Sequence, residues 1–139
     1  MAERALADTN LFIRYLEQDH PDHTEPAKAV LERVRTGELE LIVTPLVMAE
    51  LVWTLSSFYG RDKLTVMTWL LAIANTPGIE LEQRSRVLQA LVWFEEKNVD
   101  FIDAYHAAWL LEQDFDQIIS FDKKHFKRFE HVELEVPGA

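Results

Sequence analysis

The sequence predicts an α/β fold, in which a central, mostly parallel sheet of four to five short strands is flanked by helices on both faces. Two observations favour this fold. Short apolar runs alternate with longer segments whose apolar residues recur at helical spacing, which is typical of parallel sheets with helical crossovers. The length of 139 residues, 48% of them hydrophobic and 27% charged, fits a single domain spanning residues 1–139.

Five segments have strand character and seven have helical character. The expected strands are residues 5–7, 39–43, 79–81, 117–121 and 132–136. The expected helices are residues 10–18, 26–35, 45–59, 63–75, 83–97 and 101–113, with a helical turn over 123–128.

Start and stop signals bound the first of these elements. The apolar run 5–7 ends at Asp8, and residues 19–22 (Asp-His-Pro-Asp) break the helix that follows. Pro26 is favourable at the first position of the next helix, and Gly37 lies just beyond its end.

The middle of the chain has equally clear boundaries. After the strand-like run 39–43, Thr44 and Pro45 supply a helix cap and a first helical residue, and Gly60 ends that helix. Asp62 then caps the next helix, which we expect to end before a turn at residues 76–78.

The last third continues the alternation. Residues 83–97 carry apolar groups at helical spacing, at positions 87, 88, 91, 92 and 94. The run 117–121 (Gln-Ile-Ile-Ser-Phe) predicts a buried strand, and residues 132–136 predict a final edge strand.

Composition excludes several classes of function. The chain has no cysteine, which excludes disulfide scaffolds, thiolate zinc sites and cysteine nucleophiles, so any metal must be held by oxygen or imidazole. The net charge of −10 argues against binding nucleic acid over the whole surface. We see no secretory signal and no run long enough to cross a bilayer, so we expect a cytoplasmic protein without membrane association.

Glu50 is the most informative residue of the chain. It is the only charge between Leu41 and Gly60, and its helical neighbours include Leu46 and Trp53. A carboxylate flanked by apolar surface is costly unless it is protonated, paired or bound to a cation. The alternative is that Glu50 lies on the one solvated stripe of its helix.

Two further acids follow predicted strands directly. Asp8 follows the run 5–7 directly, and Asp122 follows the run 117–121 directly. Either could simply cap the next helix. Ligands of open parallel sheets, however, collect beyond the carboxyl ends of the strands, so two such acids on one rim indicate a site.

A final pair of acids opens a helix. Asp100 and Asp103 are three residues apart and can project from the same first turn, although the helix dipole alone could explain them. Converging carboxylates repel one another unless a cation lies among them, and an all-oxygen set suits Mg²⁺ or Mn²⁺. Such a cluster indicates metal-assisted phosphoryl hydrolysis by one or two ions.

These motifs resemble those of PIN-domain ribonucleases, and most closely the VapC-type toxins of toxin–antitoxin pairs. The matching pieces are residues 7–10 (Ala-Asp-Thr-Asn), 45–51 (Pro-Leu-Val-Met-Ala-Glu-Leu), 100–107 (Asp-Phe-Ile-Asp-Ala-Tyr-His-Ala) and 119–122 (Ile-Ser-Phe-Asp) with Phe126. They cover essentially the whole chain in the family's order.

The resemblance implies roles for particular residues. The acids that would bind Mg²⁺ or Mn²⁺ and carry catalysis are Asp8, Glu50, Asp103 and Asp122. Asp100 would support these acids or serve as an alternative ligand. The polar residues that would orient the carboxylates and water are Thr9, Asn10 and Ser120. It further implies cleavage of RNA, possibly tRNA or another structured RNA, a homodimer, and inhibition by a small antitoxin protein.

Other features are open to two interpretations. The basic residues after Asp122 could contact RNA phosphates or form a solvated helix face; they are Lys123, Lys124, Lys127 and Arg128. Apolar side chains of the helices over 45–59 and 63–75, Trp53 and Phe58 among them, could form an interface or belong to the core. We expect His106 to pack beside Asp103, and the other histidines, His125 included, to occupy loops or the surface.

Three alternatives remain open at this stage. A haloacid-dehalogenase-like phosphatase also has an Asp after its first strand, but requires a second Asp where Asn10 stands. A receiver-type domain requires an acidic pair near the first strand. In a non-catalytic RNA-binding or assembly module the acids would only cap helices, and the cluster would bind no metal.

Overall fold

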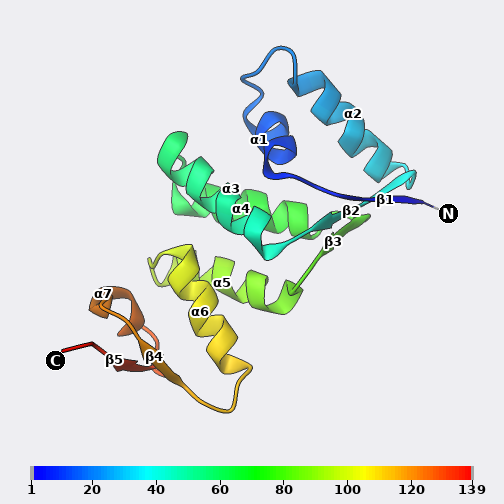
Figure 1. The fold of residues 1–139 in the computed structure, drawn as a ribbon. Coiled ribbons are helices and arrows are strands. Elements are labelled where there is room, and N and C mark those ends of the chain that lie inside the picture. Colours follow the sequence, from blue (N-terminus) through cyan, green and yellow to red (C-terminus); the bar gives the residue numbers. More distant parts are fainter. Residues whose placement is uncertain (1, 139) are drawn as a thin grey trace. The chain divides into compact units, whose positions relative to one another are not determined.

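Short parallel strands and the helices between them account for most of the chain (Figure 1). The computed structural model describes residues 2–138, which divide into two compact units, the first ending at Arg84 and the second beginning at Ser85. Each unit has its own parallel sheet and its own group of candidate site residues.

The first unit holds a three-stranded parallel sheet. Its elements are β1 (Glu3–Leu6), α1 (Thr9–Glu17), α2 (Thr24–Arg35), β2 (Leu39–Val43), α3 (Pro45–Trp53), the π-helical turn η1 (Thr54–Phe58), α4 (Lys63–Ala74) and β3 (Ile79–Leu81). The strand order is β1-β2-β3, with Leu6 opposite Ile42 and Val43 opposite Leu81. The carboxyl ends of β1 and β2 therefore meet at one edge of the sheet.

Alternation along β2 builds the core of this unit. Leu39, Leu41 and Val43 are buried, whereas Glu40 between them is exposed, which is the two-residue period of a strand with one covered face. Helix α2 contacts β2, and α4 contacts β3. The covered face fixes the register and hence the edge from which α1 and α3 leave the sheet.

Helix caps determine where α3 and α4 begin. The hydroxyl of Thr44 accepts a hydrogen bond from the backbone N–H of Val47, with Pro45 at the first helical position, and Asp62 accepts one from Thr65. The helix predicted over residues 45–59 changes character after Trp53, where Tyr59 donates to the carbonyl of Thr54 five residues earlier. Such π-turns are rare and carry no clear periodic signal in a sequence.

The second unit contains two longer helices and a two-stranded parallel sheet. Its elements are α5 (Arg84–Glu96, which begins at the last residue of the first unit), α6 (Phe101–Leu111), β4 (Gln117–Ile119), α7 (Lys123–Phe126) and β5 (Glu133–Glu135). Small residues on one face of α6 are buried, among them Ala104, Ala107 and Ala108. They recur at the three- and four-residue spacing of a helical face.

The α/β class and the parallel strands are confirmed. The strand pairing differs from the prediction, because the described strands pair in groups of three and two instead of one sheet of four to five. The strand 117–121 is also shorter and less buried than predicted, with Ile119 63% exposed. A sequence indicates which runs are extended, but the choice of pairing edge depends on tertiary packing.

Within residues 2–138, no helix combines the length and apolar character that a membrane span requires.

Candidate metal centre

Two of the predicted acids line one pocket of the first unit. Asp8 follows β1 and Glu50 projects from α3, and both border an open pocket of about 540 Å³. The other residues that line it are Leu6, Ala7, Thr9, Thr44, Leu46 and Val47. The carboxyl edge of the sheet thus brings Asp8 and Glu50 to the same depression, as the strand-end argument predicts.

Glu50 is exposed, so of the two interpretations offered by the sequence, the structure favours a carboxylate on the solvated side of its helix. Its helical neighbours Leu46 and Trp53 are themselves 81% and 66% exposed. Helix α3 buries Val47, Met48, Leu51 and Val52 and leaves the Glu50 side accessible. No burial penalty therefore requires a cation here, and the case for Glu50 rests on its sharing a pocket with Asp8.

The two polar residues that follow Asp8, Thr9 and Asn10, lie in different surroundings. Asp8 caps α1, and its Oδ1 accepts a hydrogen bond of 2.9 Å from the backbone N–H of Thr9, which is buried. Asn10 is exposed and lines a different pocket, beside Arg14. Thr9 is therefore placed to fix Asp8, whereas the support predicted from Asn10 is not seen in this arrangement.

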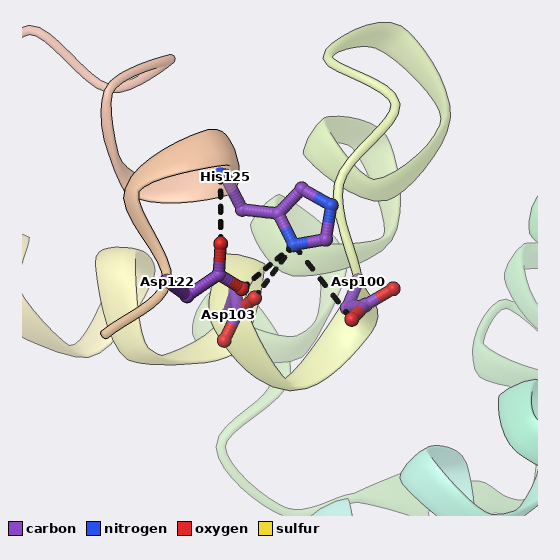
Figure 2. A group of neighbouring side chains, drawn as sticks. All are labelled: Asp100, Asp103, Asp122 and His125. Atoms are coloured by element: carbon purple, nitrogen blue, oxygen red, sulfur yellow. Dashed lines mark hydrogen bonds and ion pairs between the residues drawn. The ribbon is translucent and has the colours of Figure 1, made fainter. Parts of the chain in front are cut away.

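The second unit gathers the other predicted acids into a tight cluster. Asp100, Asp103, Asp122 and His125 each offer one ligand atom, and these atoms all lie within 4.8 Å of one another (Figure 2). Asp100 and Asp103 come from the start of α6, and Asp122 and His125 from α7. We call this group the Asp/His cluster.

His125 lies at the centre of the hydrogen bonds in the Asp/His cluster. Its Nδ1 is 2.8 Å from Asp103 Oδ2 and 3.0 Å from Asp122 Oδ2, and its backbone N–H donates to Asp122 Oδ1 at 3.0 Å. The side chain is only 15% exposed. Asp122 thus caps α7, as its position after β4 suggested, and also faces Asp103.

The two facing carboxyls have pKa values displaced in opposite directions. Burial raises the pKa of Asp103, and its shared hydrogen bond with Asp122 raises it further. The same shared hydrogen bond, followed by the one from the backbone N–H of His125, lowers the pKa of Asp122. Opposite displacements of this kind are typical of two carboxyls held close together, because ionising both brings like charges into contact.

His125 is the site residue that the sequence interpretation missed. We expected His106 to pack beside Asp103, but His106 is exposed and only borders a neighbouring pocket with it. The available signal was the spacing from Asp122 to His125, which places the histidine at the third residue of the helix that Asp122 caps. That cue depends on recognising a helix of only four residues.

Ser120 and Asp100 occupy supporting positions in the second unit. The hydroxyl of Ser120 accepts a hydrogen bond of 3.0 Å from the backbone N–H of Asp122, which fixes the start of α7. Asp100 caps α6 without a side-chain cap hydrogen bond, is 74% exposed, and lies 3.7 Å from His125 Nδ1. Its carboxylate is therefore accessible as a further ligand.

A comparison with protein-family models matches residues 5–132 to the PIN domain. The chain belongs to the PIN domain family. A search of curated proteins found no match that would name a closer relative. PIN domains are generally metal-dependent nucleases that use divalent ions, and this assignment favours the nuclease interpretation over the phosphatase and receiver alternatives.

The donors of this PIN domain suit a divalent cation. Three carboxylates and one imidazole nitrogen lie close together, and a cation among them would relieve the repulsion between the carboxylates. Asp100, Asp103, Asp122 and His125 could hold such an ion in the second unit, and Asp8 and Glu50 offer carboxylates in the first.

The basic residues beside the Asp/His cluster are not equivalent. Lys123, Lys124 and Lys127 are exposed on and after α7. Arg128 instead donates from Nη1 to the carbonyls of Lys97 at 2.6 Å and Asn98 at 2.5 Å, which ties α7 to the end of α5. The three lysines are thus the cations of this group best placed for phosphate, and Arg128 has a structural role.

Proposed function

We propose that this PIN domain is a Mg²⁺- or Mn²⁺-dependent endoribonuclease that acts as the toxin of a toxin–antitoxin pair. The observation that carries the proposal is the Asp/His cluster, in which one atom each of Asp100, Asp103, Asp122 and His125 lie within 4.8 Å of one another. Family membership supplies the reaction class, and the cluster supplies ligands for the ion that the reaction needs.

Each residue has a defined task in this proposal. Asp8, Glu50, Asp103 and Asp122 provide the carboxylates required for cleavage, and Thr9 and Ser120 hold two of these acids through backbone contacts. One or two divalent ions held by these acids would activate a water and neutralise charge on the scissile phosphate. Lys123, Lys124 and Lys127 provide positive charge for the RNA backbone in an otherwise acidic protein.

The decisive experiment is cleavage of RNA by the purified full-length chain with Mg²⁺ or Mn²⁺, beside Asp8→Asn, Glu50→Gln and Asp103→Asn. Asp114→Asn serves as a matched control, because Asp114 is an exposed acid that neither lines the pocket of Asp8 and Glu50 nor belongs to the Asp/His cluster. We expect cleavage only by the wild type and the control. Equal cleavage by all variants would contradict the proposal, and cleavage of DNA alone would contradict the choice of RNA.

Failure to bind either ion would favour the non-catalytic module, in which the acids only cap helices. Both Asp8 and Asp122 do cap helices, so capping and ligation are compatible roles that only metal binding separates.

The toxin role rests on the resemblance and on charge. The net charge of −10 would suit a small antitoxin with a basic segment. Expression of the wild type should arrest growth, Asp103→Asn should not, and a small neighbouring gene should relieve the arrest. Unimpaired growth on expression of a protein that cleaves RNA in vitro would count against the toxin role while leaving the nuclease intact.

We also propose that the chain forms a homodimer through the exposed apolar side chains of α3 and η1. Leu46, Trp53 and Phe58 are 81%, 66% and 74% exposed, and large exposed apolar side chains that form a patch are typical of protein interfaces. Light scattering should give the mass of a dimer for the wild type and of a monomer for Trp53→Ser/Phe58→Ser. A monomeric wild type would overturn this proposal.

A further inference from the structure

The ring of His125 presents one nitrogen to three carboxylates. Nδ1 lies 2.8 Å from Asp103 Oδ2, 3.0 Å from Asp122 Oδ2 and 3.7 Å from Asp100 Oδ2, whereas the other ring nitrogen points away from them (Figure 2). The side chain is 85% covered, so the ring has little freedom to leave this position.

The local backbone fixes the ring as well. The backbone N–H of His125 donates to Asp122 Oδ1, and the next residue, Phe126, is buried. His125 thus belongs to a turn that is anchored on both sides. Its orientation does not depend on the hydrogen bonds made by Nδ1 alone.

The spacing of these donor atoms is that of neighbouring ligands on one ion. Two atoms that each lie about 2.1 Å from an octahedral cation, at adjacent corners, are about 3.0 Å apart. The nitrogen–oxygen distances of 2.8 Å and 3.0 Å agree with this spacing. A hydrogen bond has the same length, so geometry permits both roles and the chemistry of the ion must distinguish them.

We propose that His125 is a nitrogen ligand of the metal centre and gives it a preference for Mn²⁺ over Mg²⁺. The inference rests on the proposed function in taking the Asp/His cluster as the cation site. Mg²⁺ favours oxygen donors and retains its waters, whereas first-row transition ions accept imidazole readily. Three carboxylates with one imidazole form a mixed set that suits Mn²⁺ better than an all-oxygen set would.

Pulsed electron paramagnetic resonance of the full-length protein loaded with Mn²⁺ tests ligation directly. A nitrogen bound to Mn²⁺ modulates the electron spin echo, so we expect this modulation in the wild type and its loss in His125→Asn. Asn carries a polar atom near the position of Nδ1, which preserves a hydrogen bond to Asp103 or Asp122 but removes the imidazole. His106→Asn is the matched control, since His106 is exposed on the helix that carries Asp103, and should retain the signal.

Calorimetric titration with each ion tests the preference. We expect His125→Asn to weaken Mn²⁺ binding about tenfold or more and Mg²⁺ binding less than about threefold. Equal losses for the two ions would assign His125 a positioning role and overturn the inference, as would bound Mn²⁺ without nitrogen modulation in the wild type.

These outcomes separate the two proposals. A wild-type protein that binds Mn²⁺, cleaves RNA and lacks nitrogen modulation refutes ligation by His125 and leaves the nuclease proposal standing. A protein that binds neither ion refutes the metal-dependent function itself.

Discussion

The two acidic groups of this PIN domain differ in how far the chain alone organises them. In the first unit, Asp8 and Glu50 share an open pocket, and Asp8 is held by one backbone N–H. In the second unit, Asp103 and Asp122 both contact His125 Nδ1, at 2.8 Å and 3.0 Å. One group is a pair of accessible carboxylates, and the other is a connected network.

This difference indicates which of the two groups can bind a cation with the smaller loss of conformational freedom. Ligands that are already held together lose little conformational freedom on binding, whereas two accessible side chains must be ordered at the moment of binding. The contacts of His125 Nδ1 with Asp103 and Asp122, at 2.8 Å and 3.0 Å, hold the ligand atoms of the Asp/His cluster together. We therefore expect the Asp/His cluster to dominate ion affinity, and both groups to be needed for turnover.

The largest expected effect is on cleavage. Asp103→Asn and Asp8→Asn should each lower the rate of RNA cleavage at saturating Mn²⁺ by at least about 100-fold, because the loss of a residue that merely supports a ligand already costs about 10- to 100-fold. Single-turnover assays measure the loss. Full activity of Asp8→Asn would show that the pocket of the first unit is not catalytic.

A double variant tests whether the two groups serve one reaction. If they do, Asp8→Asn/Asp103→Asn should lose no more activity than the more impaired single variant, because groups that act as a unit have non-additive effects. Losses that multiply would indicate independent contributions and would break the link between the two groups.

The next effect is on stability with and without metal. An ion at about 100 times its Kd should stabilise the folded protein by about 2.7 kcal/mol. We expect Asp103→Asn to remove most of this gain and Asp8→Asn to keep at least half of it, because the Asp/His cluster is the better organised group. Thermal unfolding with and without Mn²⁺ measures the gain, and the reverse order of the two variants would invert the comparison.

The residues that the sequence predicted correctly share a local cause. Thr44 and Asp62 cap helices by contacts with residues three positions ahead, so their function is encoded in adjacent sequence. Strand β2 was predicted to the residue because its run of mostly apolar residues ends directly at Thr44 and Pro45, which begin the next helix. The placement of Asp8 at a strand end likewise followed from chain order.

The failures share a different cause. The exposure of Glu50 depends on which face of α3 packs, and α3 is apolar on nearly every side, so no stripe of the sequence identified it. His125 meets Asp103 across 22 residues, and a single sequence does not show which distant side chains approach one another. Strand pairing and site completion both depend on long-range contacts, which local patterns do not encode.

In metal-free buffer, a smaller effect concerns the opposite contributions that Asp103 and Asp122 make to the stability of the folded protein. The pKa of Asp103 is raised in the folded protein above its value of 3.8 in the unfolded chain. Its contribution to stability is therefore present below pH 3.8 and is lost as the pH rises through the pKa of the folded state. A lowered pKa means that the contribution of Asp122 is present above 3.8 and is lost as pH falls through its folded value.

Neutralising the two acids should therefore shift stability in opposite directions at pH 7. Asp103→Asn should raise the Tm by about 2–4 °C and Asp122→Asn should lower it by a similar amount, which corresponds to about 1 kcal/mol for a domain of this size. Asn retains the capacity of Asp122 to cap α7, so the decrease would report the charge. Shifts of the same sign would contradict the opposite displacements of the two pKa values.

The smallest effect concerns the lysines beside the Asp/His cluster. They distinguish the two acidic groups, because none of the residues that line the Asp8/Glu50 pocket is basic. If Lys123 and Lys127 each contact one RNA phosphate, their replacement by Ala should lower RNA affinity several-fold and reduce the slope of log K against log salt by about one per lysine. Fluorescence anisotropy with RNA, on the cleavage-deficient Asp103→Asn background, measures both quantities. Lys28→Ala is the control, since Lys28 lies on α2 and pairs with Glu25. An unchanged salt slope would assign Lys123 and Lys127 to a solvated helix face and would move the search for the RNA path to the first unit.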